Sequence, residues 1–341
     1  MTSVVALGAV TVGIDLPSSH AELIEVGLIP GSESILPVER MEEIRLTLEK
    51  KRGTLPEPTS GGSVGNTVNL LARAGIRCGF MGAGGNDPFG RIFVANCERA
   101  SLSFLSELED GAVTGYDFYL YDEDDARTII LTHGANALLS PDRLDLEAIR
   151  RAELLLLDGN VLSFGPKSET AMLTCVKAAE EADVPFVLAL AGTEIVDGYR
   201  DFFENFAPEA QFVAGNLEQG AVLAGLEPEA SLDRVRTELN KTSIDAVVTL
   251  DAEGAYARFG DEEVVVPAQK TEPVDSTGAG DNFLGAFLSA RRHGLSVRHA
   301  LMVGNVVAGE VIQYKGAQLP ASLEVPDLMR TAIQIAESAD G

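Results

Sequence analysis

The sequence predicts an α/β protein of three layers, in which a mostly parallel central sheet has helices on both faces and carries a small β-sheet lid. The first observation is a set of continuous apolar runs with the length of strands that are covered on both faces. They lie at residues 4–12, 153–157, 185–190 and 246–250. The second is a set of helical segments between and after these runs, at 64–74, 167–182, 217–224 and from Gly278 onward. Alternating strands and helices pair their strands in parallel, and ligands of such sheets bind beyond the carboxyl ends of the strands.

Two regions depart from this alternation and predict the lid. Residues 113–132 alternate in polarity, turn through Asp122-Glu123-Asp124-Asp125 and return, as an antiparallel hairpin does. Residues 13–60 hold five prolines around a helix near 39–52. Hairpins that project from a parallel sheet favour a lid over a substrate, with a plain surface excursion as the alternative.

Composition excludes several classes of partner. The 341 residues carry 26 Lys and Arg against 52 Asp and Glu, a formal charge of −26 that repels nucleic acid and anionic membrane surfaces. No stretch approaches the roughly 18 apolar residues of a membrane span. The 3 cysteines form no C-x-x-C pair and the 4 histidines lack metal-site spacing, which speaks against a zinc enzyme. We therefore expect a cytoplasmic protein with reduced thiols.

The most informative motif is Asp275-Ser276-Thr277-Gly278-Ala279-Gly280-Asp281. Phe283, Leu284 and Phe287 follow it at three- and four-residue spacing, so the small residues open a helix with uncovered N–H groups. These groups and the helix dipole attract an anion, and phosphate fits best. Beside bound phosphates, Asp281 would lie where a hydroxyl proton must be removed during phosphoryl transfer. The alternative is a carboxylate that only caps the helix.

A second glycine-rich helix entrance adds to this motif. Gly61-Gly62-Ser63-Val64-Gly65-Asn66-Thr67 opens a helix and is followed by the glycine-rich segment 82–90. Alone, such a pair of glycines is typical of a turn. Together with the motif ending at Asp281, it resembles the ribokinase-like (PfkB) carbohydrate kinase family, from Val4 to about Gln318. The segment Leu28-Ile29-Pro30-Gly31 is similar to the adenosine-kinase branch.

The resemblance implies a single kinase domain over residues 1–341, with lid segments at about 13–60 and 113–132. It implies ATP and Mg²⁺ as the phosphoryl donor and transfer to a hydroxymethyl group of a sugar or sugar-containing small molecule. Asp281 corresponds to the catalytic base, and Gly278, Ala279 and Gly280 correspond to the anion hole. A requirement for K⁺ and a homodimer through the lid are further expectations of this kind.

The resemblance also assigns binding residues. The acceptor would meet Gly61, Gly62 and Asn66, since bare backbone admits a sugar ring and an amide bonds its hydroxyls. Positions near the nucleotide are Asn216, Thr249, Gly254 and Asn305. Asp275 and Thr277 lie where many relatives hold a monovalent cation.

Three departures from the family pattern concern this site. Relatives carry an aspartate at the end of the first strand, where this chain has Gly13; Asp15 shares its strand face and is either the substitute or a turn residue. The pattern Asn-x-x-Glu reads Asn216-Leu217-Glu218-Gln219, which leaves Glu218 as the carboxylate of the Mg²⁺ network. The pattern Thr-x-Gly reads Thr249-Leu250-Asp251.

The sequence therefore predicts an ATP-dependent sugar kinase. An adenosine-type nucleoside kinase is the alternative within the class. A nucleotide-binding relative with weak or no catalysis is the alternative from another class, because of the three departures. A dinucleotide-dependent dehydrogenase is more distant, since the first strand does not open onto G-x-G-x-x-G.

Overall fold

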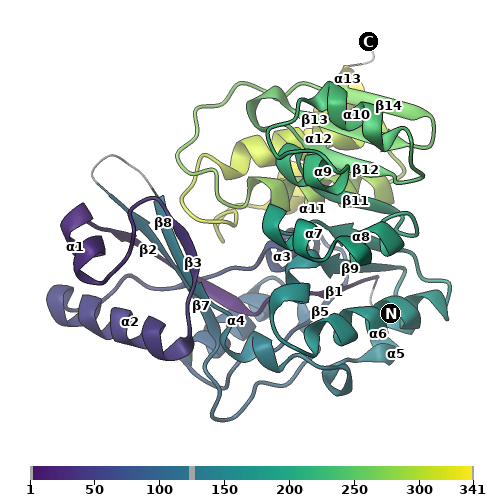
Figure 1. Cartoon of the computed structure of the whole chain (residues 1–341). Helices are drawn as coiled ribbons and strands as arrows, with labels where there is room; N and C mark the ends of the chain where they lie inside the picture. Colours follow the sequence, from purple (N-terminus) through teal and green to yellow (C-terminus); the bar gives the residue numbers. More distant parts are fainter. Residues whose placement is uncertain (1–2, 123–126, 340–341) are drawn as a thin grey trace.

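The computed structural model describes residues 3–122 and 127–339. Its main body is a nine-stranded sheet in the order β14-β13-β12-β11-β10-β9-β1-β5-β6 (Figure 1). The strands from β12 to β6 in this order pair in parallel, and β13 and β14 pair antiparallel. The bounds are β1 Val4–Leu7, β5 Cys78–Met81, β6 Ser103–Phe104, β9 Leu154–Asp158, β10 Phe186–Ala189, β11 Phe212–Asn216, β12 Ala246–Thr249, β13 Ala255–Phe259 and β14 Glu262–Val266. The predicted mostly parallel sheet is confirmed.

Helices cover both faces of this sheet, because its side chains point alternately to two apolar cores. Val4 and Ala6 of β1 belong to one core, and Val5 and Leu7 to the other. The first core is closed by α3 (Ser63–Arg73), α4 (Pro88–Arg99), α11 (Ala279–Arg292), α12 (Val297–Val311) and α13 (Val325–Ser338). The second is closed by α5 (Leu146–Arg150), α6 (Ser168–Glu180), α7 (Thr193–Gly198), α8 (Arg200–Phe206), α9 (Leu217–Leu223) and α10 (Leu232–Leu239). Short 3₁₀ helices lie at Gly134–Leu138, Pro141–Arg143, Gly159–Ser163 and Asp251–Glu253.

A second, five-stranded sheet in the order β3-β8-β7-β2-β4 projects from the main body (Figure 1). Its strands are β2 (Thr11–Pro17), β3 (Glu33–Ile35), β4 (Thr59–Ser60), β7 (Gly115–Tyr121) and β8 (Arg127–Thr132). The antiparallel hairpin predicted at 113–132 is β7 and β8, and turn residues 123–125 lie outside the described residues. Segment 13–60 supplies most of β2 together with β3 and β4, and segment 113–132 supplies β7 and β8. The two segments predicted to form the lid therefore belong to one sheet.

One expected strand is in fact two. The apolar run at 4–12 divides into β1 of the large sheet and the start of β2 in the small sheet. Asn136 fixes the crossing, because its side chain accepts a hydrogen bond from Val10 N and donates one to Val10 O, both at 2.9 Å. The run is continuous because both sheets bury their part of it: Val5, Val10 and Val12 are all fully buried. Burial alone could not reveal the change of sheet.

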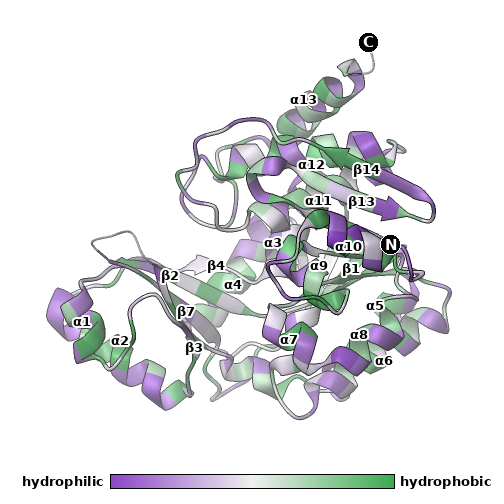
Figure 2. Ribbon diagram, turned by 45° about the horizontal axis from the view of Figure 1, so that its top comes forward, coloured by the Kyte–Doolittle hydropathy of each residue, from purple (hydrophilic) through white to green (hydrophobic). Residues whose placement is uncertain are grey.

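Helices α1 (His20–Glu25) and α2 (Val38–Arg52) cover the outer face of the small sheet. Ile14 and Phe118 of the sheet pack against Met41 and Ile44 of α2. Both helices carry hydrophilic and hydrophobic residues (Figure 2), and the buried residues of α2 are Met41, Ile44 and Leu48. A homodimer through the lid stays a prediction, and it would have to use surfaces other than this covered apolar face.

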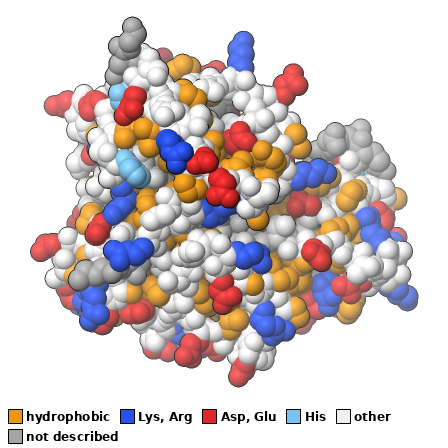
Figure 3. Space-filling model, turned by 180° about the vertical axis from the view of Figure 1, so that it is seen from behind, with side chains coloured by type: hydrophobic (Ala, Val, Ile, Leu, Met, Phe, Trp, Pro, Cys, Tyr) orange, Lys and Arg blue, Asp and Glu red, His pale blue; other side chains and the backbone are white. Residues whose placement is uncertain are grey.

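Acidic and basic side chains are interspersed on the face of the molecule seen in Figure 3. In residues 3–122 and 127–339, no helix is long and apolar enough to cross a membrane.

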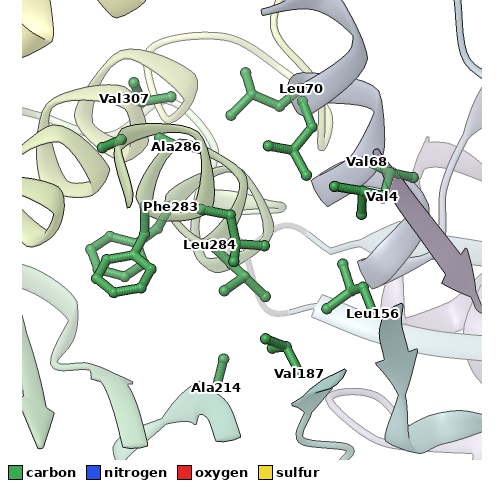
Figure 4. Packing of buried hydrophobic residues seen from close by; sticks show 14 of the residues in the cluster. Val4, Val68, Leu70, Leu156, Val187, Ala214, Phe283, Leu284, Ala286 and Val307 are labelled. Atoms are coloured by element: carbon green, nitrogen blue, oxygen red, sulfur yellow. The ribbon is translucent and has the colours of Figure 1, made fainter. Parts of the chain in front are cut away.

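Helix α11 is anchored by its apolar side. Phe283 and Leu284 point toward the sheet residues Leu156, Val187 and Ala214, and all five are buried (Figure 4). This packing fixes where the first turn of α11 ends up, at the carboxyl ends of the central strands.

Candidate active site

A cleft of about 830 Å³ lies between the small sheet and the carboxyl ends of the central strands. Most of the residues predicted for the site line it: Asp15, Gly61, Gly62, Asn66, Asn216, Glu218, Asp275, Thr277 and Asp281. The cleft lining does not include three predicted nucleotide positions, Thr249, Gly254 and Asn305. It also does not include Gly278, Ala279 and Gly280, although Thr277 and Asp281 on either side of them line the cleft.

Asp281 is half-buried in the first turn of α11 and is held by two donors from α3. Ser63 Oγ donates to Oδ1 at 2.5 Å, and Asn66 Nδ2 donates to Oδ2 at 2.8 Å. Burial raises the pKa of Asp281, and these two hydrogen bonds oppose the rise. A carboxylate with a raised pKa and a fixed orientation is suited to accept a proton near neutral pH.

Asn66 is committed to this carboxylate on one side and to Gln318 on the other. Gln318 Nε2 donates to Asn66 Oδ1 at 2.9 Å, and Asn96 Nδ2 donates to Gln318 Oε1 at 3.1 Å. Asn66 was predicted as an acceptor contact and lines the cleft; one of its two amide N–H groups and its carbonyl have protein partners here. Its geometry is that of a residue that positions Asp281. Ser63 and Gln318 were missed; Ser63 lay within the quoted motif, whereas Gln318 is 252 residues from Asn66.

The start of α11 offers unpaired backbone donors, as the motif predicted. Among the described residues, no hydrogen-bond acceptor pairs with the N–H groups of Gly278, Gly280 and Asp281, while Ala279 N reaches Ser276 O at 3.3 Å. Gly278 has φ +75°, and a Cβ there would lie 2.3 Å from Ala317 O. Glycine is therefore required at position 278 by both backbone conformation and space.

Asp275 holds this loop in place. Its Oδ1 accepts from Thr277 N at 2.9 Å and its Oδ2 from Gly316 N at 2.8 Å. Burial favours a higher pKa for Asp275, but these backbone donors, the Thr277 hydroxyl and the charge of Arg127 together outweigh it, and the pKa lies below its usual value. Arg127 of β8 donates from Nη1 to Thr277 Oγ1 at 3.2 Å, so the small sheet contacts the loop directly.

The small-sheet side of the cleft carries Asp15, as expected. Its Oδ1 accepts from Tyr121 OH at 3.2 Å, and burial raises its pKa. Gly62 has φ +87°, and a Cβ there would lie 2.8 Å from Ala9 O, so this glycine keeps the chain close to the end of β1. At Gly13 a Cβ would lie 2.7 Å from Tyr119 Cε2. The Tyr119 ring thus occupies the space that a side chain at position 13 would need.

Two carboxylates that line the cleft, Asp117 and Asp158, were not predicted from the sequence. Asp117 of β7 is the register partner of Gly13, and burial raises its pKa to about 7. Asp158 ends β9, where Asn160 N and Nδ2 donate to its Oδ1 at 3.0 and 2.9 Å; burial nevertheless raises its pKa to about 6. A signal existed for Asp158, an acid directly after a central apolar run. No local signal marks Asp117, because its place follows from strand register.

On the opposite side, Asn216 caps α9 in a capping box with Gln219. Gln219 N donates to Asn216 Oδ1 at 2.9 Å, and Asn216 N donates to Gln219 Oε1 at 3.0 Å. Gln219 is used by the fold, and Glu218 beside it lines the cleft.

The other three predicted nucleotide positions have structural partners. Thr249 Oγ1 lies 3.4 Å from Gly215 O, and Asn305 Nδ2 donates to Pro267 O at 3.1 Å. A Cβ at Gly254 would lie 2.0 Å from Val266 O, so a side chain is excluded there. Asp251 has φ +50°, a left-handed conformation that Asp tolerates better than most residues. The backbone of this loop therefore adopts a glycine-like conformation without a glycine at 251.

Histidines and carboxylates of the described segments form no group of three or more suited to hold a metal ion. What the cleft does combine is a bare helix start, a held carboxylate with a raised pKa, and a second sheet beside both. An enzyme that transfers a phosphoryl group needs this combination of anion-binding N–H groups and a base.

Comparison with known proteins identifies the family. The pfkB family carbohydrate kinase model matches residues 32–324, and the chain belongs to this family. An uncharacterized sugar kinase of Archaeoglobus fulgidus is 26% identical over 74% of this chain and 99% of its own length. A 5-dehydro-2-deoxygluconokinase of Halalkalibacterium halodurans is 29% identical over 74% of this chain and 79% of its own. The crystal structure of an adenosine kinase from Sinorhizobium meliloti superposes with a TM-score of 0.85 and 26% identity, covering 97% of this chain and 99% of that one.

These similarities confirm the ribokinase-like fold and the resemblance seen in the motifs. The protein is an ATP-dependent kinase of a sugar or nucleoside.

Proposed function

We propose that this kinase transfers the terminal phosphoryl group of ATP to a hydroxymethyl group of a neutral sugar or sugar-containing acceptor, with Asp281 as the general base. The single observation that carries the proposal is the position of Asp281, one residue beyond the bare helix start and held by Ser63 and Asn66. A helix-capping carboxylate would not need two side-chain donors from another helix.

The residues act in a simple order. The acceptor hydroxyl enters between Gly62 and Asp281, and a carboxylate oxygen of Asp281 accepts its proton as the hydroxyl oxygen attacks the terminal phosphorus of ATP. The bond from that phosphorus to the bridging oxygen breaks, and ADP leaves with this oxygen. The N–H groups of Gly278, Gly280 and Asp281 donate to the oxygens of the transferred group and stabilise their charge. Ser63 and Asn66 keep Asp281 oriented throughout.

The donor end fits nucleotide phosphates and a magnesium ion. Three unpaired amides at a helix start suit a phosphate, and the Glu218 carboxylate with the Asn216 side chain suits a hydrated Mg²⁺. When bound, Mg²⁺ neutralises charge on the nucleotide phosphates. Asn216, Thr249, Gly254 and Asn305 stay proposed for the nucleotide side, the last three through the loops that they hold.

The small sheet is proposed to act as a lid in one domain with the main body. Arg127 supports this role, because it joins the sheet to Thr277 beside the anion-binding amides. Closure would exclude water and suppress ATP hydrolysis. A monovalent cation at Asp275 and Thr277 is also proposed, and turnover in K⁺ compared with choline salts tests it. We place the enzyme in the cytoplasm, where ATP is available and where Cys78, Cys97 and Cys175, all free and buried, stay reduced.

The second candidate acceptor is a nucleoside, favoured by the superposition on the Sinorhizobium meliloti adenosine kinase. Acceptor-dependent ADP release with a panel of sugars and nucleosides separates the two. ³¹P NMR of the product then shows which hydroxyl is phosphorylated. If no sugar or nucleoside in the panel increases the release of ADP, the alternative from another class is favoured, a nucleotide-binding relative with weak or no catalysis.

Asp281→Asn tests the proposed base. We expect kcat to fall by about 10²–10⁴-fold, the usual contribution of a general base, with the affinity for ATP largely unchanged. Asp327→Asn is the matched control, since Asp327 lies in the first turn of α13 with a 67% exposed side chain. An active Asp281→Asn enzyme would remove the assignment.

A further inference from the structure

On the small-sheet side of the cleft, where the acceptor is proposed to bind, two neighbouring strands carry a glycine and a carboxylate at the same level. Gly13 of β2 and Asp117 of β7 are register partners, and both line the cleft. Position 13 cannot take a side chain without displacing Tyr119, whose Cε2 would lie 2.7 Å from a Cβ at Gly13. The carboxylate that faces the cleft at this level therefore comes from β7.

Asp117 is poorly paired in the free protein. Thr11 Oγ1 and Tyr119 OH both approach Oδ2 at 3.4 Å, longer than the about 2.5–3.0 Å of a good O–H···O bond. Within the described part of the chain, no donor lies within hydrogen-bonding distance of Oδ1. Asp117 is partly buried and lines the cleft, so a carboxylate oxygen without a close protein donor there is open to the hydroxyls of a ligand.

The charges around Asp117 are also one-sided. Eight residues that line the cleft are Asp or Glu, and none of its lining residues is Lys or Arg. Asp15 and Glu33 come from the same small sheet as Asp117, and Asp158 ends β9 of the large sheet. Burial lowers the pKa of His133, the one lining histidine, so it is neutral at pH 7.

Arg127 is the basic residue whose charge acts on both Asp117 and Asp15, but it has other partners and is not among the residues that line the cleft. The Arg127 guanidinium lies over the Tyr119 ring, 4.3 Å from its centroid, and donates to Thr277 in the anion-binding loop. An acceptor that carried its own carboxylate would thus enter a cleft lined by acidic residues, with no basic side chain among the lining residues.

We propose that Asp117 is an acceptor-binding residue that accepts hydrogen bonds from the hydroxyls of a neutral polyhydroxy acceptor, and that the carboxylates around it exclude sugar acids. The proposal rests on the proposed function, because it assigns the substrate class of the same cleft. A carboxylate accepts hydroxyl donors at both oxygens, so Oδ1 and Oδ2 of Asp117 suit two neighbouring hydroxyls of a sugar or ribosyl ring. Like charges in a protein cleft repel more strongly than they do in bulk water, which sets the preference against an anionic acceptor.

The test compares neutral acceptors with their own acids. D-glucose against D-gluconate, D-ribose against D-ribonate, and adenosine as a neutral nucleoside are offered to the unchanged enzyme, to Asp117→Asn and to Glu43→Gln. Glu43 is the matched control, a carboxylate on α2 with a 67% exposed side chain. The readouts are kcat/KM for each acceptor, KM for ATP, and acceptor affinity by calorimetry, which does not require turnover.

We expect the unchanged enzyme to prefer the neutral member of each pair. Asp117→Asn should lower kcat/KM for the best neutral acceptor by at least about tenfold, because a site built to bond hydroxyls loses a partner. At pH 8, where Asp117 is mostly ionised, it should also narrow the ratio of kcat/KM between neutral acceptor and acid by about tenfold, since one repulsive charge is gone. KM for ATP and the Glu43→Gln enzyme should be unchanged. A merely structural role would lower activity toward both members equally and leave the ratio unaltered.

Three results would overturn the proposal: a preference for the acid in either pair, an unaltered ratio in Asp117→Asn, or the same change in Glu43→Gln. Failure of the proposed function looks different. In that case no acceptor stimulates ADP release, while calorimetry still reports whether neutral acceptors bind more tightly than acids and whether Asp117→Asn removes that difference.

Discussion

The two ends of the cleft are assembled in different ways. At the α11 end, the consecutive residues 275–281 supply the unpaired amides, the carboxylate and the loop that supports them. At the small-sheet end, Gly13 and Asp15 come from β2 and Asp117 from β7, and Gly62 precedes α3. The chemistry is encoded in one short stretch of chain, whereas acceptor recognition is encoded in the pairing of separate strands. A carboxylate could therefore be moved from one strand to its neighbour by two substitutions, at positions 13 and 117, without changing residues 275–281.

The largest effect on stability should come from the α11 end. Gly278→Ala forces a Cβ to within 2.3 Å of Ala317 O at a backbone φ of +75°. We expect the free energy of unfolding to fall by about 2 kcal/mol or more, from strain and steric overlap together. Gly280→Ala is the control, because no atom lies within 4 Å of its added Cβ. Urea denaturation of both variants checks this, and equal losses would show that the left-handed turn at 278 is not the cause.

The next effect distinguishes positioning from binding at Asn66. Asn66→Ala removes the hydrogen bond that lowers the pKa of Asp281, so that pKa should rise. The base is active when deprotonated, so the acid limb of the pH profile of kcat should move to higher pH, with activity lost more at pH 6 than at pH 8. Gln318→Ala should give a smaller shift in the same direction, since it acts through Asn66. A change confined to acceptor KM would instead make Asn66 an acceptor contact.

Asp15 lies at the acceptor end, and its substitution should leave the donor end unaffected. Asp15→Ala should lower kcat/KM for the acceptor by at least about tenfold, or about 1.4 kcal/mol, with much less effect on ATP affinity. Tyr121→Phe, which removes only the donor to Asp15 Oδ1, provides the graded comparison. Unchanged acceptor kinetics in Asp15→Ala would leave recognition to Asp117 and its neighbours.

The smallest expected effect is that of Asp117 on the free energy of unfolding, because a partly buried carboxylate at the acceptor site destabilises the fold when it is ionised. The pKa of Asp117 rises from 3.8 to about 7 on folding, so the folded state binds more protons than the unfolded state between these values. Its contribution to stability is present below about pH 4 and is lost as the pH rises through 7. A full shift of this size corresponds to about 4 kcal/mol, but Asp117 is only partly buried, so Asp117→Asn should raise the free energy of unfolding by about 1 kcal/mol at pH 8 and change it little at pH 4. Denaturation at both pH values checks the difference, and a lower stability of the variant at pH 8 would contradict it.

The same contrast explains what the sequence could predict. The helix starts at Ser63 and Ala279, the buried strands β9, β10 and β12, and the β7–β8 hairpin all follow from local spacing. Asp281 could be singled out because its motif is contiguous. Asp117 could not, because its place opposite Gly13 depends on the register of two strands more than 100 residues apart. The contact of Gln318 with Asn66 could not be predicted either, because the two residues are 252 positions apart in the sequence. The division of residues 4–12 between two sheets could not be predicted because both sheets bury their part of this run.

The account depends most on the separation of chemistry from acceptor binding, and one measurement tests it directly. Single-turnover phosphoryl transfer is followed at saturating ATP and acceptor in the unchanged enzyme and in Asp281→Asn, with the acceptor Kd measured on the same samples. We predict that the transfer rate falls by about 10²–10⁴-fold in Asp281→Asn while the acceptor Kd changes less than about twofold. A transfer rate that is retained at saturation, with the loss appearing only in the acceptor Kd, would contradict the assignment of Asp281 as the base.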